Sequence, residues 1–72
     1  MAKNSPSLAD DRLYTEREAA RFLNLSHRTL QDWRVTGRGP AFIRLESAVR
    51  YRAADLLAFV NARVCPQNGE AR

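Results

Sequence analysis

Residues 15–36 read TEREAARFLNLSHRTLQDWRVT, and this stretch decides the fold. Thr15 is followed three residues later by Glu18, which is the spacing of a capping box. Apolar residues at helical spacing then predict a helix over residues 16–23. Asn24 follows, and asparagine tolerates the left-handed conformation that ends many helices. The stretch therefore opens with a short, capped helix and a tight turn.

A second helix is predicted directly after that turn. Ser26 is a good N-cap, and Leu30 and Trp33 lie three residues apart on the inner side of the helix. The helix is expected to end near Gly37. A small residue is needed where two such helices cross, and Ala20 meets that need. The spacing as a whole predicts a helix-turn-helix unit.

The residues after the unit predict a hairpin and a closing helix. Residues 41–45 and 49–51 are two short β-forming runs that flank a three-residue link. Alternation along the two runs places Arg44 and Arg50 together on the face opposite the apolar residues. Residues 53–64 have the apolar spacing of a helix. We expect a mainly α fold with a small β-hairpin, a winged helix-turn-helix with a two-stranded wing before the closing helix.

The length of 72 residues allows one domain with a thin core and no deep pocket. Residues 1–12 and 65–72 lack periodicity and are expected to be disordered tails around a folded part at 13–64. The single cysteine forms no internal disulfide. The chain has neither an apolar run of membrane-spanning length nor a secretory signal pattern, so we expect a cytoplasmic protein.

Basic charge gathers in the middle third of the chain. The formal net charge is +4, and the excess of basic residues lies in residues 26–52. This segment contains six arginines and only two acidic residues, Asp32 and Glu46. A concentrated basic stripe is typical of a protein that binds nucleic acid. Arginine suits phosphate and guanine edges better than lysine does. Codon bias would explain the preference for arginine, but not its clustering.

The outward side of the second predicted helix is the candidate for reading DNA bases. Arg28 would bind guanine and Gln31 would bind adenine in the major groove, while Asp32 would accept from cytosine or orient Arg28. The expected base-reading residues are His27, Arg28, Gln31 and Asp32. Residues expected to contact the DNA backbone are Ser26, Thr29, Arg34, Arg38, Arg44 and Arg50.

The same residues also have plainer interpretations. Arg28 and Asp32 would form a solvated ion pair of little energetic weight if they did not bind DNA. Trp33 is in register with Leu30 and is expected in the core rather than as a base-stacking platform. His27 has no partners at metal-ligand or catalytic spacing. We therefore expect no enzymatic activity, cofactor, metal, small-molecule substrate or membrane partner.

The order of these parts resembles the excisionase and AlpA-like regulators, winged-helix proteins related to the MerR DNA-binding domain. Residues 13–20 resemble their opening, residues 26–33 their recognition helix, and residues 37–44 and 49–56 their wing and closing helix. The resemblance implies that the second helix enters the major groove and that the wing contacts an adjacent minor groove or backbone. Glu46 departs from the pattern, because relatives often carry glycine and basic residues at the wing tip.

Three functions are compatible with this reading. The resemblance implies an excisionase of a phage or integrated element, which assembles as neighbouring copies on double-stranded DNA, bends the attachment site and directs an integrase. The shortness of the chain favours this hypothesis. A small AlpA-like transcription regulator on the same fold is the alternative. A protein-interaction adaptor that has lost DNA binding is the third, and the acidic wing tip is its only support.

Overall fold

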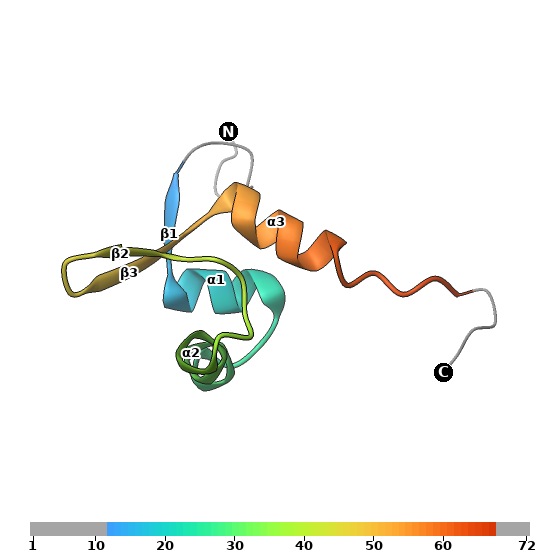
Figure 1. Ribbon diagram of the computed structural model, residues 1–72, viewed down its shortest axis with the longest axis horizontal. Helices are drawn as coiled ribbons and strands as arrows, with labels where there is room; N and C mark the ends of the chain where they lie inside the picture. Colours follow the sequence, from blue (N-terminus) through green and yellow to red (C-terminus); the bar gives the residue numbers. More distant parts are fainter. Residues whose placement is uncertain (1–11, 68–72) are drawn as a thin grey trace.

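The computed structural model describes residues 12–67 (Figure 1). The remaining parts of the two expected tails, residues 1–11 and 68–72, lie outside the described residues. The elements follow in the order β1 (Leu13–Thr15), α1 (Glu16–Leu23), α2 (His27–Thr36), β2 (Ile43–Leu45), β3 (Ala48–Arg52) and α3 (Ala53–Asn61). This arrangement confirms the mainly α, winged helix-turn-helix fold class. No helix in this part of the chain is long and apolar enough to cross a membrane.

The two ends of α1 are held by the local contacts that the sequence predicts. The Thr15 hydroxyl accepts a hydrogen bond from the Glu18 amide at 3.1 Å, and the Glu18 carboxylate accepts from the Thr15 amide at 2.9 Å. Asn24 adopts the left-handed conformation at φ 59° and ψ 42°. The Leu25 amide then donates to the Ala20 carbonyl at 2.9 Å. These bonds satisfy backbone groups that a helix end leaves without partners.

Helix α2 also begins and ends as predicted. The Ser26 hydroxyl accepts from the Thr29 amide at 3.0 Å, which caps the first turn. Gly37 ends the helix at φ 77°, a conformation that glycine adopts without a steric penalty. The Arg38 amide donates to the Trp33 carbonyl at 2.8 Å and closes the last turn.

A third strand joins the expected hairpin, and the sheet has the order β1-β3-β2. Strand β1 was not predicted from the sequence, because three residues are too few to show alternation. Both neighbours of β3 are antiparallel to it, and Tyr14 of β1 lies opposite Tyr51 of β3. Both tyrosines are buried. Because β1 runs directly into α1, this pairing fixes the start of α1 beside the central strand.

The expected register of the hairpin is wrong. Glu46 and Ser47 form a two-residue turn, so Arg44 lies opposite Val49 and Arg50 lies opposite Ile43. Residues directly opposite each other in an antiparallel pair project to the same face. Arg44 therefore shares the face of Val49, and Arg50 is on the other face. A link one residue shorter than expected reverses the facing of one strand relative to the other.

The core forms where α1, α2, β3 and α3 meet. Leu30, Tyr51 and Leu56 are fully buried, and Ala19 and Ala20 allow α1 to approach them closely. Trp33 packs against this core and lies 5.9 Å from the Phe59 ring, measured between centroids. The core position expected for Trp33 is therefore confirmed.

Helix α3 is shorter than the expected 53–64. It ends at Asn61, and Val64 is 68% exposed. Two of its apolar residues, Leu57 and Val60, are 40% and 38% exposed. Leu56, in contrast, is fully buried. Packing supplies most of the stability of a short helix, so α3 ends where its contacts with the core end.

Candidate nucleic-acid interface

The exposed side of α2 carries three of the predicted base-reading residues. Arg28, Gln31 and Asp32 are all exposed, and their spacing of three and four residues places them on one face. No ion pair joins Arg28 to Asp32 in the part of the chain that the structure describes. The guanidinium of Arg28 is therefore available to a ligand.

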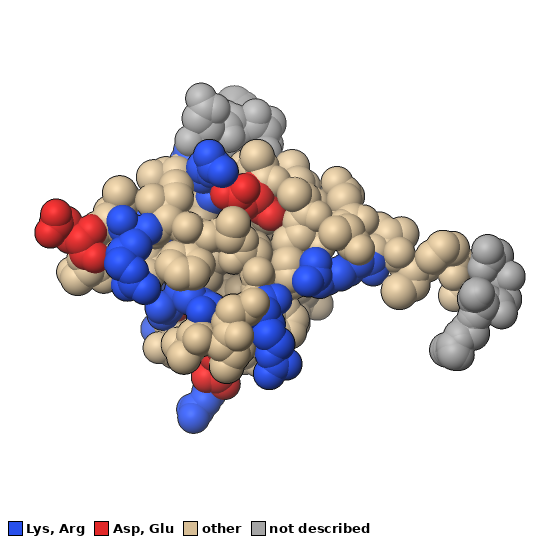
Figure 2. Space-filling view, viewed as in Figure 1, with Lys and Arg blue, Asp and Glu red and all other residues tan. Residues whose placement is uncertain are grey.

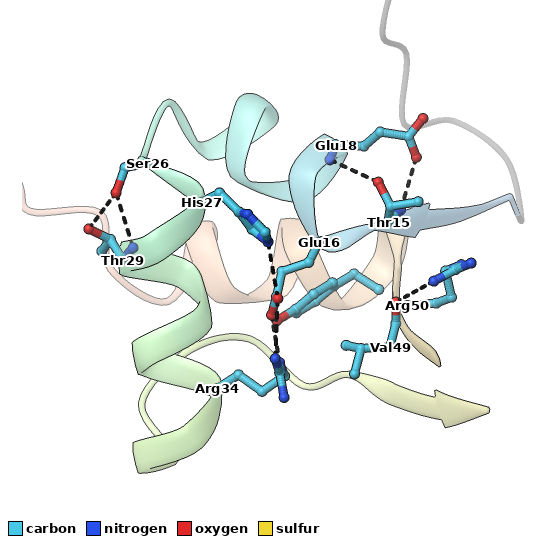
Figure 3. Close-up of polar contacts among 10 residues, drawn as sticks. Thr15, Glu16, Glu18, Ser26, His27, Thr29, Arg34, Val49 and Arg50 are labelled. Carbon is cyan, nitrogen blue, oxygen red and sulfur yellow. Dashed lines mark hydrogen bonds and ion pairs between the residues drawn. The ribbon is translucent and has the colours of Figure 1, made fainter. Parts of the chain in front are cut away.

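His27 occupies a different position from the one expected. Its Nε2 atom lies 3.4 Å from a carboxylate oxygen of Glu16 in α1, and 37% of its side chain is exposed (Figure 3). The imidazole thus faces α1 rather than the outer face that Arg28 shares with Gln31. His27 faces inward because it lies on the same helical stripe as the buried Leu30, three residues later.

Arg34 also turns toward α1. Its Nε donates to Glu16 Oε2 at 2.6 Å and its Nη2 donates to Oε1 at 3.3 Å, which leaves 16% of the side chain exposed (Figure 3). Arg34 was expected to hold the DNA backbone, but its guanidinium is committed to this pair. The spacing could have indicated this, because Arg34 lies seven residues, or two turns, after His27.

Glu16 is the centre of a polar cluster that the sequence analysis did not find. Its carboxylate also accepts from the Tyr51 hydroxyl at 3.0 Å, and 11% of its side chain is exposed. One carboxylate therefore joins the start of α1 to both α2 and β3. Spacing within α1 cannot reveal this, since the partners of Glu16 lie 18 and 35 residues away.

The environment of Glu16 stabilises its charged form. Burial by itself raises the pKa of this carboxyl group, but hydrogen bonds from Arg34 and Tyr51 and the charge of Arg34 outweigh burial and lower the pKa. Burial, and then the neighbouring carboxylate, raises the pKa of the Tyr51 hydroxyl well above its usual value. Glu16 is thus ionised and Tyr51 is a neutral donor at physiological pH.

Two of the predicted backbone-contacting residues lie at the start of α2. The Ser26 hydroxyl donates to the Thr29 hydroxyl at 2.9 Å while it accepts from the Thr29 amide. The Thr29 hydroxyl is the acceptor from Ser26, so it keeps its own hydrogen for another acceptor. The pair can therefore cap α2 and donate to a phosphate at the same time.

The other three predicted backbone contacts do not form one patch. Arg38 is exposed just beyond α2, and its Nε lies 3.4 Å from the Thr36 hydroxyl. Arg44 lies over the Phe42 ring, 5.7 Å from its centroid, whereas Arg50 projects to the other face of the hairpin and donates to the Val49 carbonyl at 2.8 Å.

Charge of both signs is visible on the surface. Figure 2 shows basic atoms over α2 and beside the hairpin, and acidic atoms at the outer end of the hairpin, where Glu46 begins the turn. Arg17 and Arg21 of α1 are also exposed, and the sequence analysis assigned them no role. Their four-residue spacing on a helix could have indicated a basic pair on one face.

Within residues 12–67, no three side chains of histidine, cysteine, aspartate or glutamate gather closely enough to hold a metal ion.

Comparison with known proteins places the chain in a family. A comparison with curated proteins gives no match. A family model described as a helix-turn-helix domain matches residues 13–64, and this family contains excisionase and AlpA-like proteins. The resemblance is therefore confirmed. The helix-turn-helix fold suggests DNA binding, and families with this domain are typically not enzymes. The chain belongs to the helix-turn-helix domain family.

Proposed function

We propose that this chain binds double-stranded DNA sequence-specifically and acts as an excisionase. The observation that carries the proposal is the exposed face of α2, on which Arg28, Gln31 and Asp32 stand together on a helix-turn-helix scaffold. An exposed helix of this kind fits the major groove, where arginine can bind guanine and glutamine can bind adenine through paired hydrogen bonds. Asp32 would accept from the amino group of cytosine.

The Glu16 cluster holds the recognition helix α2 rigidly against the rest of the domain. It joins α2 to α1 through Arg34, and α1 to β3 through Tyr51. Strand β3 is half of the hairpin, so the recognition helix and the wing are held in one fixed relation. A fixed relation allows both elements to engage DNA without a further loss of conformational freedom.

In this function, the protein binds as neighbouring copies on attachment-site DNA, bends that DNA and directs an integrase. It works in the cytoplasm and needs no cofactor. The family supports this role, because excisionase-like proteins are among its members. AlpA-like proteins belong to the same family, so a promoter is the alternative target of the same interface.

A gel-shift titration tests the proposal. The DNA is the attachment-site region of the element that encodes the protein, with random competitor DNA and two salt concentrations. A ladder of sequence-preferring complexes supports the excisionase, and one discrete complex at a promoter supports the regulator. The absence of a shift at low salt would refute DNA binding and favour the adaptor, for which the acidic Glu46 at the wing tip is the only support.

A further inference from the structure

Two shallow hollows meet on the surface between α1, α2 and the hairpin. One has a volume of about 320 Å³ and the other about 470 Å³. Arg17 and His27 line both hollows, so the two hollows lie next to each other. We call the two adjacent hollows together the trough. Its polar lining includes Glu16, Arg17, Arg21, Arg34, Ser47 and Arg50.

The trough is strongly basic. Four arginines line it against one carboxylate, that of Glu16. This carboxylate is already engaged by Arg34 and Tyr51. Among residues 12–67, no carboxylate forms an ion pair with Arg17, Arg21 or Arg50. These three guanidinium groups therefore bring positive charge to the trough without an ion-pair partner among the described residues.

The donors of the trough suit a row of phosphates. A guanidinium has five N–H donors, so Arg50 keeps several after its bond to the Val49 carbonyl. Ser47 adds an exposed hydroxyl on the hairpin side. Arginine binds phosphate through two parallel hydrogen bonds, and the Arg17 side chain between the two hollows can reach into either.

The position of the trough identifies its ligand. It lies between the first turn of α2, which the proposed function places in the major groove, and the hairpin, which the same proposal places on the DNA beside that groove. A backbone strand separates any two adjacent grooves of a duplex, so one strand must pass between these elements.

We propose that the trough binds the phosphodiester backbone of one DNA strand, with Arg17 at the centre and Arg21 and Arg50 at the two ends. The inference rests on the proposed DNA-binding function. It adds α1 to the interface and replaces Arg34, whose guanidinium is occupied, with Arg17 and Arg21 as backbone contacts.

The test measures the salt dependence of binding to a fluorescein-labelled duplex of random sequence by fluorescence anisotropy. A plot of the logarithm of the binding constant against the logarithm of the salt concentration has a negative slope. Each phosphate contact that is lost makes this slope shallower by about one unit. Arg17→Gln is expected to make the slope shallower by about one, and Arg17→Gln with Arg50→Gln by about two. Arg63→Gln is the matched control, because Arg63 is exposed but lies over the Phe59 ring, outside the trough.

The outcomes separate the two proposals. If the wild-type protein binds the duplex but Arg17→Gln keeps the wild-type slope, the trough proposal is overturned and DNA binding stands. If the wild-type protein fails to bind at low salt, both are overturned, and binding of an acidic peptide such as polyglutamate would identify the trough as a protein-binding surface. A second readout is the NMR signal of the Arg17 side-chain Nε–Hε group, which must shift when the duplex is added and must not do so if Arg17 is only structural.

Discussion

Replacing Glu16 with glutamine tests the central polar cluster. The carboxylate accepts from Arg34 at 2.6 and 3.3 Å and from Tyr51 at 3.0 Å, and 11% of its side chain is exposed. Glutamine has nearly the same shape, but one acceptor oxygen becomes an amide group that faces donors. The guanidinium of Arg34, 16% exposed, then loses its counter-charge.

The expected cost follows from these contacts. Hydrogen bonds to charged groups contribute about 1.5–3 kcal/mol each, and breaking a buried ion pair costs about 3–5 kcal/mol. Since the pair keeps some solvent and glutamine keeps one acceptor, we expect Glu16→Gln to lower the free energy of unfolding by about 2–3 kcal/mol. That is a large share of the total, since a domain of this size has about 3–8 kcal/mol. The midpoint of thermal unfolding should fall by roughly 10–20 °C.

Glu18→Gln is the matched control. It removes the same charge from the same helical turn, but the Glu18 side chain is 48% exposed, and glutamine also fits the capping box. We expect a loss of about 0.5 kcal/mol or less, from the helix dipole and the exposed ion pair with Arg12. Both variants are measured by urea and thermal unfolding followed by circular dichroism. A loss in Glu16→Gln no larger than that in Glu18→Gln would refute the structural role of the cluster.

The acid range provides an independent check. Because folding lowers the pKa of Glu16, its charge contributes stability that is complete above the unfolded pKa and is lost as the pH falls through the folded pKa. The difference in stability between the wild-type protein and Glu16→Gln should therefore shrink on acidification below the ordinary glutamate pKa. A difference that stays constant over that range would show that the charge of Glu16 is not the cause.

Three further predictions concern DNA binding. Arg28→Ala should weaken binding to the target by about 1–3 kcal/mol and relax the preference at one base pair, measured by competition among single-base variants of the site. Arg50→Ala should weaken binding to all DNA sequences alike and make the salt dependence of binding shallower by about one unit. Equal effects of Arg28→Ala and Arg50→Ala on binding to random DNA would contradict these assignments. Glu46 has φ 59°, so Glu46→Gly should raise the free energy of unfolding by about 0.5–1 kcal/mol and also tighten DNA binding, because it removes strain together with a negative charge. Glu46→Gln should tighten binding without the gain in stability, and a failure of either variant to tighten binding would place the wing tip away from DNA.

Much of the candidate site could be predicted from spacing along one helix. The exposed face of α2 follows from a period of 3.6 residues, and Arg28, Gln31 and Asp32 are found where that period places them. His27 and Arg34 were placed incorrectly, although they lie on the same stripe as Leu30. The error arose because a polar residue was assumed to face solvent, whereas a carboxylate on a neighbouring helix turns both side chains inward.

The sequence by itself determined the local parts of this protein: the capping box at Thr15, the left-handed Asn24, the Ser26 cap and the helix ends at Leu23 and Thr36. These features depend on hydrogen bonds between residues no more than five apart, so a short stretch contains all the partners.

Only the tertiary structure decided the pairing of β1 with β3, the facing of Arg44 and Arg50, the Glu16 cluster and the trough between α1 and the hairpin. The pairing of β1, the Glu16 cluster and the trough join elements that are distant in the chain, and the facing of Arg44 and Arg50 depends on the register of the hairpin. A two-residue turn in place of a three-residue link changes that register. Local spacing cannot distinguish the two, because the choice depends on which residues on the β2 side of the hairpin pack on the core, and Phe42 does so beside the Tyr51 ring.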